Sequence, residues 1–179
     1  EPSLATVLQI QRALGVESGA QVTVIDQLSA HKHERLQHVQ DRIRLLDLDL
    51  RIPGQAEAFR GHDVVLHLAA KVGGIRFNIN HQGGMLRDNL LLAVNVLDAA
   101  KDAKVERVLM VSSACVYPRF CALPTPESEG FRDLPEPTNL GYGWAKRTSE
   151  LLARTYVEEF GMRIAIARPY NAYGPRDHF

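Results

Sequence analysis

The sequence predicts an α/β fold with a doubly wound parallel sheet, and three observations support this class. Short apolar runs rich in Val, Ile and Leu recur along the 179 residues, without the alternation of half-exposed strands. Segments with the apolar spacing of helices separate several of these runs. Hydrophobic residues make up 45% of the chain, enough for a buried core. We therefore expect strands covered by helices on both faces, joined by right-handed crossovers, in one domain over residues 1–179.

The apolar runs place five strands, at residues 22–26, 43–50, 63–70, 107–113 and 163–169. Each run is bounded by polar or turn-forming residues, and none shows strict alternation. Because both faces read as apolar, we expect a buried parallel sheet rather than a sheet with one wet face.

Helical spacing predicts three helices. Residues 4–14 present one apolar face, and glycines at positions 15 and 19 follow it. Residues 85–103 form the second expected helix, and residues 139–160 the third, which Gly161 ends. On this third helix the inward side chains are expected to be Leu151, Leu152, Tyr156 and Phe160.

A long irregular stretch covers residues 117–143 and carries many prolines and glycines. It is too long for a routine connection between elements. A disordered insertion is one interpretation. We favour the other, a loop that shapes a ligand site, because it follows the carboxyl end of a strand.

Charge and hydropathy exclude some partners. Lys and Arg together number 21, as do Asp and Glu, so no net positive field favours nucleic acid or an anionic membrane. No apolar run approaches the ~20 residues that span a bilayer, and the first residues lack the features of a signal peptide. We expect a small-molecule partner, with neither nucleic acid nor membrane.

The cysteines and histidines indicate no metal site. Cys115 and Cys121 are the two cysteines, which is no disulfide framework, so the pattern suits the reducing cytoplasm. Their spacing matches no standard zinc pattern. The histidines at 31, 33 and 38 alternate irregularly with charged residues and receive no role.

The segment "YGWAK" is the best local signal for chemistry. It places Tyr142 and Lys146 one turn apart on the same helix face. A phenol titrates near ~10, so its use as a base at neutral pH needs a nearby cation such as Lys146. An isolated pair of this kind is usually surface packing. Ser113 at the preceding strand end makes a proton relay the better interpretation, with the serine on a substrate oxygen.

Two acids follow expected strands. Asp26 ends the strand 22–26, where a nucleotide-binding sheet places an acid on the adenosine ribose. Asp49 and Leu50 end the next strand and can frame an adenine edge. Taken alone, each acid is equally well an ordinary turn residue.

Four motifs occur together in one order: "HLAA", "VSSACVYP", "YGWAK" and "RPYNAYGP". With them the chain resembles the extended short-chain dehydrogenase/reductase family, the NAD-dependent sugar-nucleotide epimerases and dehydratases. "AAKVGGI" and "SSACVYP" are typical of its GDP-mannose 3,5-epimerases and GDP-L-fucose synthases. The resemblance implies a Rossmann-like, three-layer fold, a homodimer and a nucleotide-sugar substrate, most often GDP-linked. It also implies a reaction in which the sugar is oxidised at C4, exchanges protons at adjacent carbons and receives its hydride back from NAD.

The resemblance also implies roles for individual residues. The catalytic residues would be Ser113, Cys115, Tyr142 and Lys146, the last also holding the nicotinamide ribose. The dinucleotide would be lined by Asp26, Asp49, Leu50, Leu68, Ala69, Ala70, Lys71 and Asn89, together with Tyr142 and Lys146. The sugar nucleotide would contact Gly73, Gly74, Ser113 and Asn171, and residues 117–143 and 169–179 would form part of the substrate region.

Alternatives remain for the thiol and for the cofactor. In related epimerases the position of Cys115 holds an acid/base beside a transient 4-keto group, whereas a free cysteine is often a buried structural residue. Sugar 4,6-dehydratases carry an acidic pair there instead. Asp26 disfavours the 2′-phosphate of NADP, but Lys32 and Arg35 follow it, so an NADPH-dependent epimerase-reductase of the GDP-L-fucose synthase kind is the alternative. A non-catalytic binding or structural protein is the alternative of another class.

The chain departs from the family pattern at both ends. "EPSLATVLQI" contains neither the first buried strand nor the Gly-rich turn that approaches the pyrophosphate. That strand is normally central, between the strand ending at Asp26 and the strand ending at Ala70. We therefore expect a fragment with two half-sheets, which also lacks the second acid/base and the remaining substrate region.

Overall fold

A computed structural model describes residues 19–27 and 37–171, with only the backbone described at 37–39. The chain divides into two compact units, residues 1–50 and residues 51–179. The helix expected at residues 4–14 lies outside the described residues.

The first unit contains a two-stranded parallel sheet. Its strands are β1 (Val22–Asp26) and β2 (Ile43–Asp47), and the 3-10 helix η2 (Gln37–Arg42) leads into β2. Pairing runs from Val22 with Ile43 to Asp26 with Asp47. The prediction that the second strand continues to residue 50 is wrong, because its partner strand ends at Asp26 and the ladder ends with it.

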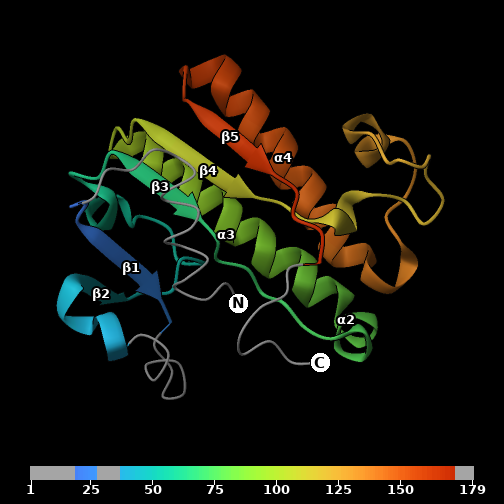
Figure 1. Ribbon diagram of the computed structural model, residues 1–179, viewed down its shortest axis with the longest axis horizontal. Helices are drawn as coiled ribbons and strands as arrows, with labels where there is room; N and C mark the ends of the chain where they lie inside the picture. Colours follow the sequence, from blue (N-terminus) through green and yellow to red (C-terminus); the bar gives the residue numbers. More distant parts are fainter. Residues whose placement is uncertain (1–18, 28–36, 172–179) are drawn as a thin grey trace. The chain divides into compact units, whose positions relative to one another are not determined.

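The second unit contains a three-stranded parallel sheet in the order β3, β4, β5 (Figure 1). The strands are β3 (Val64–His67), β4 (Arg107–Val111) and β5 (Ile164–Ala167). Each ends two or three residues before its predicted end. The strand pairing ends before the predicted ends because the chain leaves the sheet there, at the segments that carry the candidate site.

The described residues of this unit, 51–171, form three α-helices: α2 (Ile75–Asn80), α3 (Gln82–Asp102) and α4 (Leu140–Phe160). The helices α3 and α4 pack side by side (Figure 1). Leu97 and Ala100 of α3 are fully buried, and Val108 and Met110 of β4 are nearly so. The sequence predicts α3 and α4 within three residues of their bounds but misses α2, which is too short to show a helical period.

Gly161 ends α4 as predicted. Its φ of 66° lies in the left-handed region, and its N–H donates to the Val157 carbonyl oxygen at 3.1 Å. A left-handed residue of this kind closes a helix at low cost only when it is glycine.

The inward face expected for α4 is wrong for Leu151 and Phe160, whereas Leu152 and Tyr156 are half-buried. Leu151 is 54% exposed and Phe160 43%, whereas Lys146, Ser149 and Glu150 are buried. Large apolar residues at helical spacing are typical of a core face. In α4, however, the polar side chains point inward, because they meet the ends of the strands and the 117–143 loop. Trp144, the single tryptophan of the chain, also lies on the outer side, 38% exposed, with the Arg147 guanidinium 5.3 Å from its ring centre.

The irregular stretch at 117–143 contains short 3-10 helices but no longer element before α4. These are η5 (Glu127–Phe131) and η6 (Pro137–Asn139), and a single antiparallel bridge joins Pro118 to Pro135. Further 3-10 turns occur at η3 (Ala56–Phe59) and η4 (Ala114–Val116). The last four residues of the predicted loop form the first turn of α4.

The parallel α/β class is confirmed. Within the described residues, β1 and β3 belong to different sheets, in different units. The two half-sheets that the sequence predicts thus appear as two separate ladders in the described part of the chain, and the missing central strand stays a prediction.

Candidate active site

Four predicted catalytic residues come from three neighbouring segments of the second unit. Ser113 follows β4 and caps η4, which contains Cys115. Tyr142 and Lys146 lie in the first two turns of α4. The elements therefore bring together residues that are up to 33 positions apart in the sequence.

Hydrogen bonds connect this group. The Ser113 hydroxyl oxygen accepts from the Cys115 backbone N–H at 3.2 Å, and the Ser113 side chain acts to lower the pKa of Tyr142. Lys146 donates from Nζ to the Val111 carbonyl oxygen at 2.8 Å. Its ammonium lies 5.7 Å from the centre of the Tyr142 ring. The ammonium is thus fixed beside the phenol by the end of β4.

Burial dominates the titration of this pair. It raises the pKa of Tyr142 to about 12, with Cys115 acting in the same direction and the Ser113 hydrogen bond against it. Burial also lowers the pKa of Lys146 to about 8, against the opposite effect of Cys115 and Glu150. Near neutral pH the phenol therefore keeps its proton, and Lys146 remains mostly in its charged form.

Cys115 is half-buried and free, so it is not a core residue. A negative charge at its sulfur acts to raise the pKa of both Tyr142 and Lys146. The backbone holds it tightly, since a Cβ at Gly143 would lie 2.5 Å from the Cys115 carbonyl oxygen. The thiol therefore has both the partial exposure and the neighbours that a group acting on a substrate requires.

Cys121 lies in the loop, half-buried, with its sulfur 3.5 Å from the Thr125 hydroxyl. In the described part of the chain, no group of three His, Cys, Asp or Glu side chains is arranged to hold a metal ion. None of the described helices is long and apolar enough to cross a membrane.

The segment after β3 carries the predicted dinucleotide residues of this unit, the half-buried Leu68, Ala69, Ala70 and Lys71. Asn89 on α3 fixes this segment. Its side chain accepts from the Lys71 N–H at 2.9 Å and donates to the Lys71 carbonyl at 3.0 Å and to the Met85 carbonyl at 2.8 Å. The Asn89 amide therefore holds the Lys71 segment in place, and its role beside the dinucleotide stays a prediction.

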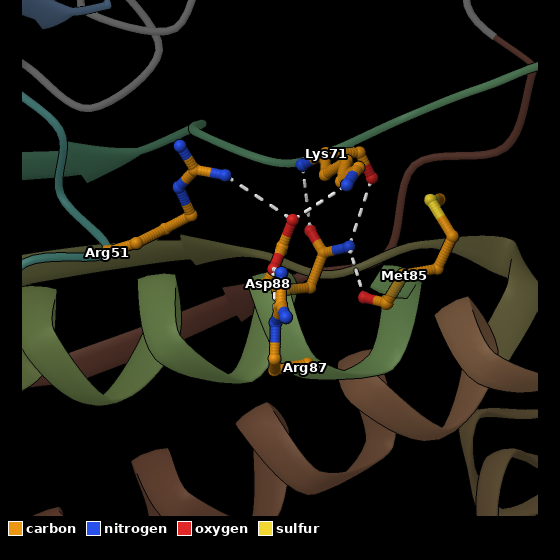
Figure 2. A network of polar contacts seen from close by, with 6 residues as sticks. Arg51, Lys71, Met85, Arg87 and Asp88 are labelled. Atoms are coloured by element: carbon orange, nitrogen blue, oxygen red, sulfur yellow. Dashed lines mark hydrogen bonds and ion pairs between the residues drawn. The ribbon is translucent and has the colours of Figure 1, made fainter. Parts of the chain in front are cut away.

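Asp88, next to Asn89, gathers three cations around one buried carboxylate (Figure 2). Lys71 donates at 2.7 Å, Arg87 at 2.8 Å and Arg51 at 3.4 Å. The Lys71 hydrogen bond is the largest cause that lowers the pKa of Asp88 to about 2, with Arg87 in the same direction and burial against it. The local charge around Asp88 is therefore positive.

The predicted adenosine residues belong to the first unit. Asp26 is the last residue of β1, and its carbonyl oxygen accepts from the Leu48 N–H at 3.2 Å. Asp49 and Leu50 follow β2, and Leu50 is buried. All three lie at the carboxyl end of a parallel pair, where nucleotide ligands bind in such sheets.

The predicted substrate residues lie at the start of α2 and after β5. Gly74 is the N-cap of α2, and a Cβ at Gly73 would overlap the Phe77 ring. Asn171 is exposed and is the last described residue before the C-terminal end. A larger residue at position 73 would therefore require the partly exposed Phe77 ring to move.

Sequence reasoning missed three charged residues of the site. Glu150 is fully buried one turn after Lys146, Arg168 pairs with it, and Asp88 anchors Lys71. The spacing from Lys146 to Glu150 places both on one helix face and was a usable signal. The Arg168 and Asp88 partners are distant in sequence and had no comparable signal.

Comparison with family profiles matches residues 11–179 to "NAD dependent epimerase/dehydratase family". The chain is 35% identical over 136 residues to a GDP-L-fucose synthase of Sinorhizobium fredii, covering 74% of this chain and 43% of that protein. It is 34% identical over 130 residues to GDP-mannose 3,5-epimerase 1 of Oryza sativa subsp. japonica, covering 72% of this chain and 34% of that protein. The chain thus spans less than half the length of these curated relatives.

Among solved structures, the chain resembles DesIV, a dTDP-glucose 4,6-dehydratase from Streptomyces venezuelae with NAD bound. The TM-score is 0.81 at 29% identity, over 98% of this chain and 55% of that one. Its fold is thus shared over nearly all of the present chain.

Proposed function

Since the chain belongs to the NAD dependent epimerase/dehydratase family, we propose that the whole protein is an NAD-dependent nucleotide-sugar epimerase acting on a GDP-linked sugar. The observation that carries this proposal is the grouping of Ser113, Cys115, Tyr142 and Lys146, with a half-buried thiol beside the Tyr and Lys pair. The similarity to a GDP-mannose 3,5-epimerase and a GDP-L-fucose synthase supports the GDP-linked substrate.

The residues present fit a nicotinamide ribose beside Lys146. An ammonium has three donors, and the Val111 carbonyl takes one of them. Lys146 would hold the ribose with the others, while Asp26 would accept hydrogen bonds from the adenosine ribose. The dinucleotide, when bound, supplies the hydride acceptor and donor for C4 of the sugar.

Proton transfer at the C4 oxygen is the proposed task of Tyr142. The neutral phenol suits the return step, in which the C4 carbonyl oxygen gains a proton. For the forward step, the Lys146 ammonium is the cation that favours phenolate. Ser113 would hydrogen-bond the same sugar oxygen.

Proton exchange at the neighbouring carbons is the proposed task of Cys115. A carbonyl at C4 acidifies the hydrogens on C3 and C5, so the thiolate form of Cys115 would remove a proton and become the thiol, which would then return a proton to the carbon. Gly73, Gly74 and Asn171 would contact the sugar nucleotide.

Incubation of the whole protein with GDP-mannose in deuterated water tests this function. We expect solvent deuterium to enter a ring carbon next to C4, detected by NMR and mass spectrometry, and Tyr142→Phe to abolish the exchange. No deuterium in any ring carbon, with GDP-mannose or other nucleotide sugars, contradicts the epimerase.

An NADPH-dependent epimerase-reductase is the second candidate, and the GDP-L-fucose synthase relative favours it. The two candidates differ in what Asp26 does, because its carboxylate repels a 2′-phosphate. Dissociation constants for NAD and NADPH separate them. We expect NAD to bind more tightly than NADPH. Asp26→Asn should bring the two dissociation constants closer together.

The partner that we propose is a second copy of the chain. Leu91 and Val94 on α3, and Leu151 and Val157 on α4, are 37–54% exposed on neighbouring helices. Analytical ultracentrifugation should show a dimer that Leu151→Glu dissociates. A monomeric wild-type protein at micromolar concentration would remove this proposal.

A further inference from the structure

A buried ion pair lies behind the candidate site. Glu150 of α4 is fully buried, and the Arg168 side chain, just after β5, is 10% exposed. The pair is bidentate, with Arg168 Nε on Oε1 at 2.7 Å and Nη2 on Oε2 at 2.6 Å. A buried charge pair is costly unless its remaining lone pairs and donors are also satisfied.

The remaining partner of Glu150 is the strand end that carries Ser113. Ser112, which is buried, donates from its hydroxyl to Oε1 of Glu150 at 2.5 Å. Its backbone N–H donates to the Ala167 carbonyl oxygen at 2.7 Å. The carboxylate thus binds the residue immediately before Ser113.

The third guanidinium nitrogen of Arg168, Nη1, binds the 117–143 loop. It donates to the Glu127 carbonyl oxygen at 2.6 Å and to the Tyr117 hydroxyl at 3.2 Å. A Cβ at Gly130 would lie 2.7 Å from this same nitrogen. The guanidinium is therefore enclosed by the loop, and the loop position depends on it.

The charge of Glu150 also reaches the catalytic lysine. Glu150 and Cys115 favour the charged form of Lys146, whereas burial disfavours it. The other groups that face Lys146 among the described residues are the Val111 carbonyl, the Tyr142 ring and the neutral His67. Burial lowers the pKa of Arg147, which lies on the side of α4 toward the loop, and the Glu150 charge opposes this lowering.

We propose that Glu150 is a positioning residue that joins the Ser113 strand end, the 117–143 loop and Lys146, so that the catalytic groups and the substrate loop share one buried carboxylate. This role rests on the proposed function, because it positions the groups that would act on the sugar. A purely structural ion pair would stabilise the fold without affecting turnover or the Lys146 titration.

Glu150→Gln in the whole protein is the principal test, because it keeps the shape and removes the charge. We expect kcat to fall about 10- to 100-fold with little change in NAD binding. The negative charge of Glu150 raises the pKa of Lys146, so removing it should let Lys146 lose its proton at lower pH. We therefore expect the decrease in kcat at high pH to begin at lower pH in this variant. Glu150→Asp, which keeps the charge, should restore the pH profile. Glu158→Gln, on the exposed side of α4, is the matched control.

Direct titration of Lys146 separates this inference from the proposed function. In protein labelled with ¹³C at lysine Cε, the Lys146 signal should titrate at lower pH in Glu150→Gln than in wild type. This measurement decides the coupling even if no nucleotide sugar is turned over, a result that would contradict the proposed function alone. Unchanged kcat, pH profile and Lys146 titration in folded Glu150→Gln would reduce the pair to a structural one.

Ser112→Ala covers the case in which Glu150→Gln does not fold. It removes only the bond to the strand end and leaves the Arg168 pair intact. A fall in kcat at near-wild-type stability supports positioning of Ser113, and an unchanged kcat overturns it.

Discussion

The Asn89 side chain engages both backbone polar atoms of Lys71, accepting from its N–H at 2.9 Å and donating to its carbonyl at 3.0 Å. This two-point contact fixes the loop at Lys71 to α3 through a side chain. Asn89→Ala leaves these two groups and the Met85 carbonyl without their partner. We expect a loss of roughly 2–4 kcal/mol in the free energy of unfolding, measured by urea denaturation. Asp102→Ala, at an exposed position near the end of the same helix, should cost much less, because it removes only an exposed ion pair with Lys101. An equal loss would argue against the contact.

The junction between α3 and α4 allows no side chain at Gly141. A Cβ there would overlap the Gln82 carbonyl oxygen, and the Gly141 N–H donates to Gln82 Oε1 at 2.6 Å. Gly141→Ala should therefore destabilise the protein by about 1–3 kcal/mol. Gly83→Ala is the matched control, since a Cβ there meets nothing within 4 Å and should stabilise α3 by about 0.5–1 kcal/mol. Similar thermal midpoints for the two variants would contradict the packing.

His67 should weaken the fold in acid. Burial, followed by the charge of Lys146, lowers the pKa of His67 to about 3, well below the value near 6.5 in an unfolded chain. Between these values the unfolded state binds the extra proton, so stability falls as pH falls, by up to about 1.4 kcal/mol per pH unit. Urea denaturation at pH 7 and pH 5 should show a smaller loss for His67→Gln than for wild type. Parallel losses would show that His67 is not buried in its neutral form.

Cys115→Ser should separate fold from chemistry. The Cys115 backbone, whose N–H donates to Ser113, is retained, so we expect near-wild-type stability and NAD binding. A hydroxyl is a much weaker acid than a thiol, so deuterium exchange at the sugar ring should fall by at least about 10²-fold. Exchange at the wild-type rate in deuterated water would exclude the thiol from the reaction.

Much of the parallel fold was predictable because buried strands of this kind are continuous apolar runs. Their ends were not, since the apolar runs continue past the last ladder bond, as at Leu68. The Tyr142 and Lys146 pair was predictable because its spacing is local. The Glu150 and Arg168 pair was not, because 18 positions separate its members and only the chain crossing from α4 to β5 brings them together.

Trp144 has a practical consequence, because it stands two positions from Tyr142 in the first turns of α4. It is the single tryptophan of the chain, so the tryptophan fluorescence of these residues comes from one side chain. With part of its indole exposed and the Arg147 cation nearby, its emission depends on the polarity around the helix start. The chain therefore carries one intrinsic fluorophore on the helix that holds Tyr142 and Lys146, and a change in its emission on adding a nucleotide sugar would report binding without a label.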